Sequence, residues 1–291
     1  MDTFELDVDG TTLAVHRFGD GPNVAVAVHG ITGSGLSYGA MARWLPPQWS
    51  LVAPDLRGRG GSTDTGHEGL AGHARDVVAV IEHAADGPVV LVGHSMGAYV
   101  ALLAAADRPD LVSRLILVDG GLPLRLPADA DPDEVLAVTL GPALARLSRT
   151  FGSEQEYVEF FRAHPAMGPY WNDDIETYAR YDATGPDGAV RSKVREAPVR
   201  VDGRELLTAV DGFGAALRSL SVPTLLLTAP GGMFDTPPGF MPEPLVAHWR
   251  GEAPALSTEL VDGSNHYTIV LGAAAEVVAA RVADGSTWPT G

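Results

Sequence analysis

Two serines of the sequence lie in the pattern G-x-S-x-G, in which a serine nucleophile stands on a sharp turn between a strand and a helix. Ser95 lies in GHSMG at 93–97, and Ser37 lies in GLSYG at 35–39. An apolar run, 89–92, precedes the first pattern, and an alanine-rich stretch that favours a helix follows it. The segment ITGSG separates Ser37 from the apolar run before it, so Ser37 falls in a loop or at a helix start. We therefore expect Ser95, and not Ser37, to be the nucleophile.

A turn of this kind lies at the end of a strand within a sheet, and the sequence contains eight short segments that resemble strands. Several of them are continuous apolar runs, which are typical of strands buried on both faces of a parallel sheet. Because helical stretches alternate with these strands, we expect an α/β protein with a doubly wound, mostly parallel sheet of eight strands. The expected strands are 3–9, 11–18, 23–30, 50–55, 88–93, 114–120, 223–229 and 255–263, and the helical stretches are 36–45, 67–85, 96–107 and 272–283.

The alternation is interrupted once, between Asp119 and Pro223, where about a hundred residues lack a strand-like run. A helical block of this length between two core strands predicts a cap over one end of the sheet. We expect a core formed by 1–121 and 221–291, with a helical cap at 122–220. The candidate helices of the cap are 132–150, 153–163, 173–182 and 204–219.

The composition excludes several classes of function. The formal net charge of −17 disfavours nucleic acids and anionic membrane surfaces as partners. The chain has no cysteine, which excludes disulfides, Cys-ligated zinc and a thiol nucleophile. The histidines do not follow a zinc-binding pattern, and we expect no metal. Since neither a signal peptide nor an apolar run long enough to span a membrane is visible, we expect a soluble, cytoplasmic protein.

Six motifs together resemble the α/β-hydrolase family, and they occur in the order found in that family. They are VHGITGSG, APDLRGRGGS, LVGHSMGAYVA, LILVDG, VPTLLLTAP and GSNHYTIV, and they extend over nearly the whole chain. The resemblance is to the serine-hydrolase, esterase-like branch with a helical cap. It implies a Ser-His-acid triad that needs no cofactor.

His266 resembles the catalytic base of this family, because VDGSNHYTIV places it between the last strand and the final helix. The acid of the triad has two candidates. Most members carry it after the strand that follows the cap, in a G-x-x-D pattern that Asp235 matches a few residues late. Other members carry it at the end of the strand before the cap, where Asp119 ends LILVDG. We take Asp235 as the first candidate and Asp119 as the alternative.

The resemblance also assigns an oxyanion hole and leaves the pocket open. Two backbone N–H groups, those of Ile31 and Met96, correspond to the donors that stabilise the oxyanion in this family. The cap segment 157–181 is rich in aromatic residues, which either form the core of the cap or line an apolar pocket above Ser95. The candidates for substrate binding are Tyr157, Phe161 and Trp171.

These residues together predict hydrolysis of a carboxylic ester, lactone or thioester of a small apolar substrate through an acyl-enzyme. The same triad is associated in this family with cofactor-free perhydrolysis of the haloperoxidase type, C–C bond hydrolysis and acyl transfer. A different class, a small-ligand binding protein without turnover, is the third hypothesis. The sequence leaves the oligomeric state and the identity of the substrate open.

Overall fold

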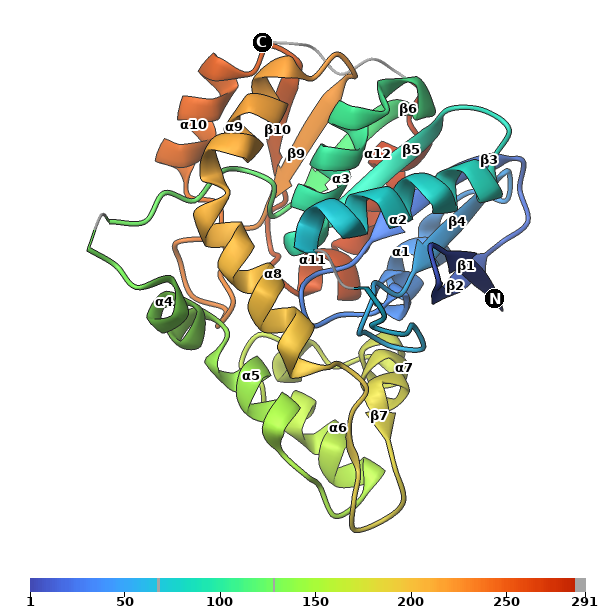
Figure 1. Cartoon of the computed structure of the whole chain (residues 1–291), viewed down its shortest axis with the longest axis vertical. Helices are drawn as coiled ribbons and strands as arrows, with labels where there is room; N and C mark the ends of the chain where they lie inside the picture. The colour runs from blue at the N-terminus through green and yellow to red at the C-terminus, as the bar shows by residue number, and fades with distance from the viewer. Residues whose placement is uncertain (67–68, 128, 286–291) are drawn as a thin grey trace.

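A computed structural model of the chain describes residues 1–66, 69–127 and 129–285. Its centre is an eight-stranded sheet in the order β1-β2-β4-β3-β5-β6-β9-β10, shown in Figure 1. Strand β2 pairs antiparallel with β1 and β4, and the remaining pairs are parallel. The predicted doubly wound, mostly parallel sheet is therefore confirmed. The strands are β1 (Asp2–Val8), β2 (Thr11–Phe18), β3 (Asn23–Val28), β4 (Trp49–Pro54), β5 (Val89–His94), β6 (Val112–Val118), β9 (Thr224–Thr228) and β10 (Leu256–Leu260).

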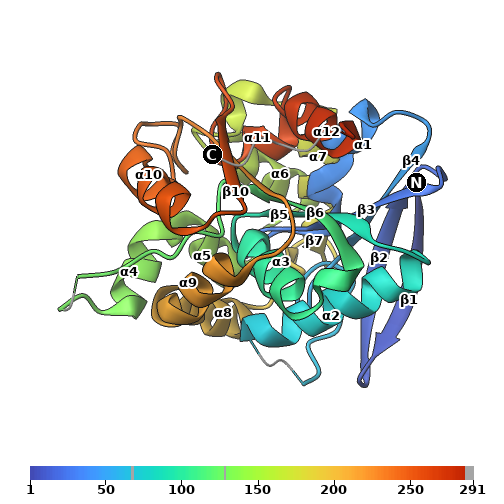
Figure 2. The ribbon, with the colours of Figure 1, turned by 90° about the horizontal axis from the view of Figure 1, so that it is seen from above.

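The central strands are apolar on both sides because helices cover both faces of the sheet. Successive residues of β5 alternate between two hydrophobic clusters, with Leu91 in one and Val90 and Val92 in the other. Helices α2, α3 and α9 belong to the first layer, and α1 and α12 to the second, as Figure 2 shows. The α-helices outside the segment 122–208 are α1 (Gly39–Trp44), α2 (Gly69–Ala84), α3 (Met96–Asp107), α9 (Val210–Ser219), α10 (Glu243–Glu252), α11 (Thr268–Leu271) and α12 (Ala275–Ala283).

Two of the expected core helices differ in extent. The stretch 36–45 divides into a 3-10 turn, η1 (Gly35–Tyr38), and the short α1. The stretch 272–283 begins its helix three residues late, at Ala275, and α11 precedes it. The first two residues of the stretch 67–85 lie outside the described residues.

Most of the segment between β6 and β9, from α4 to α8, lies below the sheet in Figure 1, and we refer to this block as the cap. Its expected helix 132–150 divides into α4 and α5, because Pro142 stands at the start of α5. The side chains of Ser153 and Asn172 accept hydrogen bonds from backbone N–H groups at the starts of α6 and α7. The cap elements are α4 (Pro132–Thr139), α5 (Gly141–Ser148), α6 (Glu154–Arg162), η3 (Gly168–Tyr170), α7 (Asp173–Asp182), β7 (Ala183–Thr184), β8 (Arg191–Ser192) and α8 (Glu196–Thr208).

Helix α9 falls within the range 122–220 that the sequence indicated as cap, but it packs on the sheet. The rings of Phe213 in α9 and Tyr99 in α3 lie 4.9 Å apart, which places α9 in the same layer as α3. The expected helix 204–219 is thus two helices, with α8 in the cap and α9 in the core.

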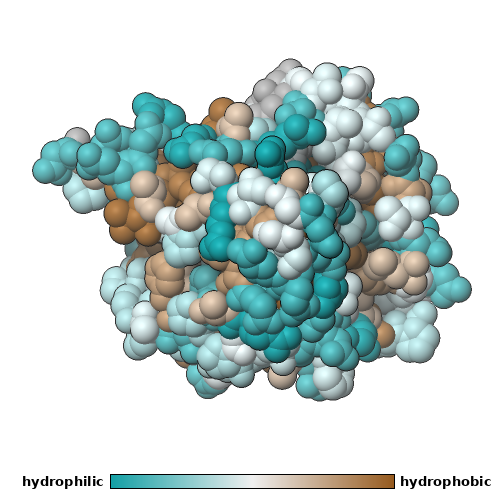
Figure 3. All heavy atoms as spheres, turned by 90° about the horizontal axis from the view of Figure 1, so that it is seen from below, coloured by the Kyte–Doolittle hydropathy of each residue, from teal (hydrophilic) through white to brown (hydrophobic). Residues whose placement is uncertain are grey.

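The outer surface of the cap, seen in Figure 3, is hydrophilic over most of its area with smaller apolar patches between. Among its apolar side chains, Val138 of α4 and Val201 of α8 are exposed. Within the described ranges, none of the helices combines the length and apolar character needed to cross a membrane.

Candidate active site

Ser95 lies on a strained turn between β5 and α3. Its φ of 55° and ψ of −122° are unusual for a residue with a side chain. The flanking glycines make this turn possible, since a Cβ on Gly93 would lie 2.2 Å from the carbonyl oxygen of Gly97. A Cβ on Gly97 would lie 2.0 Å from the carbonyl oxygen of Val28. The G-x-S-x-G spacing of this motif therefore has a steric reason here.

Ser37 occupies a different setting, although it matches the same five-residue pattern. It lies in η1, and its hydroxyl donates a hydrogen bond to the carbonyl oxygen of Ser34 at 2.8 Å. This local hydrogen bond is typical of serine in a turn.

His266 lies within reach of Ser95 and is almost completely buried. Its Nε2 is 3.1 Å from the Ser95 Oγ, and its Nδ1 is 2.7 Å from Oδ2 of Asp119. Because a carboxylate accepts hydrogen bonds, the proton of the neutral ring is assigned to Nδ1, which leaves Nε2 free to accept the serine proton.

The two candidate acids are placed differently, and the geometry favours the alternative, Asp119. Asp119 follows β6 directly, and its N–H donates to the Leu227 carbonyl at 2.7 Å. Its Oδ1 accepts a hydrogen bond from the N–H of Ala229, so the sheet fixes both its backbone and its side chain.

Asp235, the first candidate from the sequence, is not among the hydrogen-bond partners of the His266 ring in the described part of the chain. Its carboxylate accepts one hydrogen bond from the Tyr170 hydroxyl and one from Asn265 Nδ2, each at 3.0 Å. The physical reason is the loop after β9, which directs Asp235 toward the cap.

The segment 29–33, the expected oxyanion loop, lies against Ser95, since a Cβ on Gly30 would be 3.2 Å from the Ser95 Cβ. The Gly30 carbonyl accepts hydrogen bonds from His29 Nδ1 at 2.7 Å and from the N–H of Gly33 at 2.9 Å. In a trans peptide the C=O and N–H groups point in opposite directions. The N–H of Ile31 therefore points away from the two groups that donate to the Gly30 carbonyl.

His29 keeps one protonation state in this arrangement. Its Nε2 accepts a hydrogen bond from the N–H of Leu56 at 3.0 Å, which leaves the proton on Nδ1 for the Gly30 carbonyl. Burial lowers the pKa of His29 to about 4, so the ring is neutral near pH 7. The second expected donor, the N–H of Met96, is at the start of α3, where backbone N–H groups lack partners within the helix.

His94, the residue before Ser95, holds the backbone of His266. Its Nε2 donates to the carbonyl oxygen of His266 at 2.7 Å, and the two rings lie 4.9 Å apart. Burial, followed by the charge of His266, lowers the pKa of His94 to about 3. Its position next to Ser95 was the only signal of this contact in the sequence.

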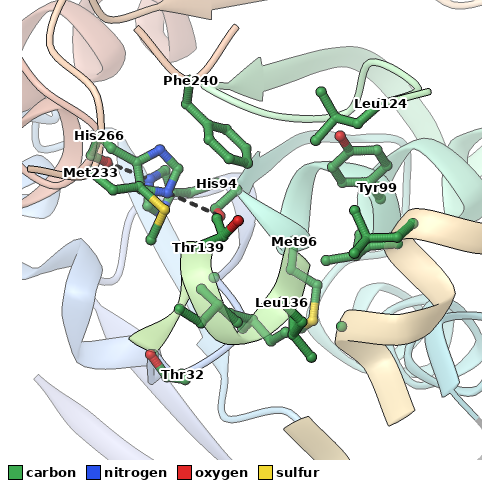
Figure 4. Close-up of a pocket in the computed structure, with 18 of the residues that line it drawn as sticks. Thr32, His94, Met96, Tyr99, Leu124, Leu136, Thr139, Met233, Phe240 and His266 are labelled. Carbon is green, nitrogen blue, oxygen red and sulfur yellow. Dashed lines mark hydrogen bonds between the residues drawn. The ribbon is translucent and has the colours of Figure 1, made fainter. Parts of the chain in front are cut away.

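A cavity of about 540 Å³ opens beside Ser95 and His266. Figure 4 shows Leu124, Leu136 and Phe240 around this space, together with Met96. The walls come from α4 and α8 of the cap, from the segment after β9 and from α10. The apolar lining includes Tyr99, Leu140, Leu206, Leu207, Met233, Leu245 and Trp249, and the polar lining includes Thr32 and Thr139.

The three aromatic residues expected to bind substrate do not line this cavity. The hydroxyl of Tyr157 donates to Asp182, and the guanidinium of Arg146 lies 4.7 Å from the ring centre of Phe161. Trp171 stacks with Arg162 at 4.4 Å. Tyr157 and Phe161 belong to the core of the cap, where they pack beside the buried Arg146–Asp182 pair. Phe161 lines a smaller neighbouring cavity of about 40 Å³.

Among the described residues, no group of three or more His, Asp or Glu side chains is arranged to hold a metal ion.

A model of the alpha/beta hydrolase family matches residues 25–281, so the chain belongs to this family. The resemblance indicated by the sequence motifs is thereby confirmed.

The individual relatives include lipases and other hydrolases. Lipase LipV of Mycobacterium tuberculosis is 35% identical over 145 residues, which are 48% of this chain and 55% of that protein. The chain thus spans about half the length of this curated relative.

Solved structures match over almost the full length. A thioesterase domain from the curacin biosynthetic pathway has a TM-score of 0.76 at 23% identity and covers 98% of this chain and 99% of its own. E-2-(acetamidomethylene)succinate hydrolase has a TM-score of 0.78 at 23% identity, with 97% of each chain covered. At these identities, the likeness concerns the fold.

Proposed function

We propose that this chain is a serine hydrolase that cleaves a carboxylic ester, lactone or thioester of a small apolar substrate. One observation carries the proposal, namely the hydrogen-bonded series Ser95–His266–Asp119 beside a mostly apolar cavity. The relationship to Lipase LipV supports this class of reaction.

The reaction begins when the Ser95 Oγ attacks the carbonyl carbon of the substrate and His266 Nε2 takes its proton. Asp119 holds the ring and stabilises the imidazolium that forms. The N–H groups of Ile31 and Met96 donate to the oxyanion of the tetrahedral intermediate.

The intermediate then collapses to an acyl-enzyme, and His266 returns the proton to the leaving alcohol or thiol. A water molecule, deprotonated by His266, attacks the acyl carbon and releases the carboxylic acid with free Ser95. The apolar walls of the cavity bind the hydrocarbon part of the substrate by removing its surface from water.

The test combines a fluorophosphonate probe with hydrolysis of a p-nitrophenyl ester. We expect one adduct per chain, on Ser95, and a loss of kcat on the order of 10⁶-fold in Ser95→Ala. Ser37→Ala is the matched control, since it lies in the other copy of the pattern and should keep both activities. An adduct on Ser37, or full ester hydrolysis by Ser95→Ala, would contradict the proposal.

A further inference from the structure

Arg59 is a fully buried arginine that connects three parts of the molecule. It lies in the loop after β4, and its side chain is 0% exposed. Its Nε donates to the carbonyl oxygen of Ile31 at 3.0 Å, and its Nη1 donates to the carbonyl oxygen of Arg57 at 2.8 Å. Its Nη2 donates to Oδ2 of Asp202 at 2.6 Å. One side chain therefore joins the core loop, the oxyanion loop and helix α8 of the cap.

Asp202 supplies the negative charge that makes this burial possible. A guanidinium remains charged in proteins, and a buried charge is strongly unfavourable without a partner. Asp202 is also completely buried, and His73 Nε2 lies 3.1 Å from the same carboxylate oxygen. The position of Arg59 under the oxyanion loop thus depends on a residue that the cap supplies.

The contact with Ile31 matters because Ile31 stands between two peptide planes. His29 and the N–H of Gly33 hold the plane before it, through the Gly30 carbonyl. Arg59 holds the plane after it, through the Ile31 carbonyl. With both planes fixed, the direction of the Ile31 N–H is fixed as well.

The cap also holds the next carbonyl of the loop, that of Thr32. Arg146 Nη2 donates to it at 3.3 Å, and the Tyr178 hydroxyl lies 3.5 Å from it. Side chains that belong to the cap, or depend on it, therefore hold two consecutive carbonyl groups of the oxyanion loop.

We propose that Arg59 and Asp202 are positioning residues that couple the seating of helix α8 to the alignment of the Ile31 oxyanion donor. The cap would then contribute to the chemical step in addition to shaping the cavity. This inference rests on the proposed function, in which Ile31 stabilises the oxyanion.

The same loop provides a matched control two residues earlier. Arg57 donates to both carboxylate oxygens of Asp76, at 2.7 and 2.6 Å, and this pair is also buried. The further hydrogen bonds of the Arg57 guanidinium go to Thr11 and to backbone carbonyls outside the oxyanion loop. Breaking this pair removes a buried ion pair of the same kind without removing a hydrogen bond to Ile31.

The experiment compares Asp202→Asn with Asp76→Asn. The measurements are the rate of fluorophosphonate labelling of Ser95, kcat and KM for a p-nitrophenyl ester, and the melting temperature. We expect both variants to melt at a lower temperature. Only Asp202→Asn should lose labelling rate and kcat, on the order of 10- to 100-fold, with KM nearly unchanged.

A double variant, Arg59→Met with Asp202→Leu, keeps the test valid if the single variant does not fold. Replacing a buried ion pair by apolar residues of similar volume is often neutral for stability. We expect this folded variant to show the same loss of labelling rate and kcat.

The outcomes separate the two proposals. A wild-type chain that resists the probe overturns the proposed function and the coupling with it. If the wild type is labelled normally and the folded double variant reacts at the same rate, the coupling is overturned and the proposed function is not. Equal rate losses in Asp76→Asn and Asp202→Asn also overturn the coupling.

Discussion

The ends of strands β6 and β9 each lead to an aspartate, and the two aspartates are held in different ways. Asp119 follows β6 directly and is fixed by backbone groups of the neighbouring strand and its end. Asp235 lies in the loop seven residues after the last residue of β9, Thr228, and is held by Tyr170 and Asn265. A residue at a strand end has a position that the sheet determines, whereas a loop residue takes a position that depends on its surroundings. The aspartate that forms a hydrogen bond with His266 is therefore determined by where the sheet places it, and not by the spacing of the G-x-x-D pattern.

The most direct way to break this comparison is to neutralise each aspartate in turn. We expect Asp119→Asn to lower kcat by about 10³- to 10⁴-fold, because the NH2 group of the amide would donate to Nδ1 and favour the wrong tautomer, and a neutral amide does not stabilise the imidazolium. Asp235→Asn should leave kcat close to the wild-type value and cost about 1 kcal/mol of stability. Ester hydrolysis and denaturant unfolding measure the two effects. A larger loss of kcat in Asp235→Asn would reverse the assignment.

The cap also contains two apolar residues that are placed differently. Leu206 lines the cavity, whereas Phe161 lies in the cap core. We expect Leu206→Trp to lower kcat/KM for a long-chain ester at least about tenfold relative to a short-chain ester, because the larger ring fills the cavity. Phe161→Leu should leave this ratio unchanged while lowering the stability by about 1–2 kcal/mol. A panel of p-nitrophenyl esters provides the measurement, and a changed ratio in Phe161→Leu would contradict the assignment of the cavity wall.

The smallest expected effect concerns the end of β5, where His94 is buried and uncharged. Its pKa of about 3 lies below the value near 6.5 expected for an unfolded chain. Between these values the unfolded state binds a proton that the folded state does not, so the stability falls as the pH falls. The slope for one such histidine is about 1.4 kcal/mol per pH unit.

We therefore expect the stability of His94→Asn to depend less steeply on pH between pH 4 and 6, by up to this amount. Urea unfolding at several pH values would measure the slope. His248→Asn, at an exposed position on α10, is the control and should keep the wild-type slope. Equal slopes in wild type and His94→Asn would show that this ring is not held neutral by burial.

The parts of the site that depend on local sequence could be predicted. The strand before Ser95, the small residues around it and the helix after it are neighbours in sequence, and the structure contains all three. The place of His266 was predictable from the order of the elements. Hydrogen bonds across distant segments, such as His94 to the His266 carbonyl, leave no pattern in one sequence.

The cap was predictable as a helical block but not in its packing. A cluster of aromatic residues has the same sequence pattern whether it faces a ligand or fills a small core. In this cap the aromatic residues Tyr157 and Phe161 contact the buried pair of Arg146 and Asp182 in the cap interior, and they do not face the cavity. Charged residues give no sign in the sequence that they are buried.

The backbone of Ser95 has a consequence for how this chain can evolve. A residue with a side chain at a φ of 55° and ψ of −122° raises the free energy of the folded state, whereas glycine at the same position would relieve most of that strain. Glycine would also remove the hydroxyl group. Selection for thermal stability alone would therefore favour glycine at this turn, so we expect the serine to persist only where the proposed activity is selected as well.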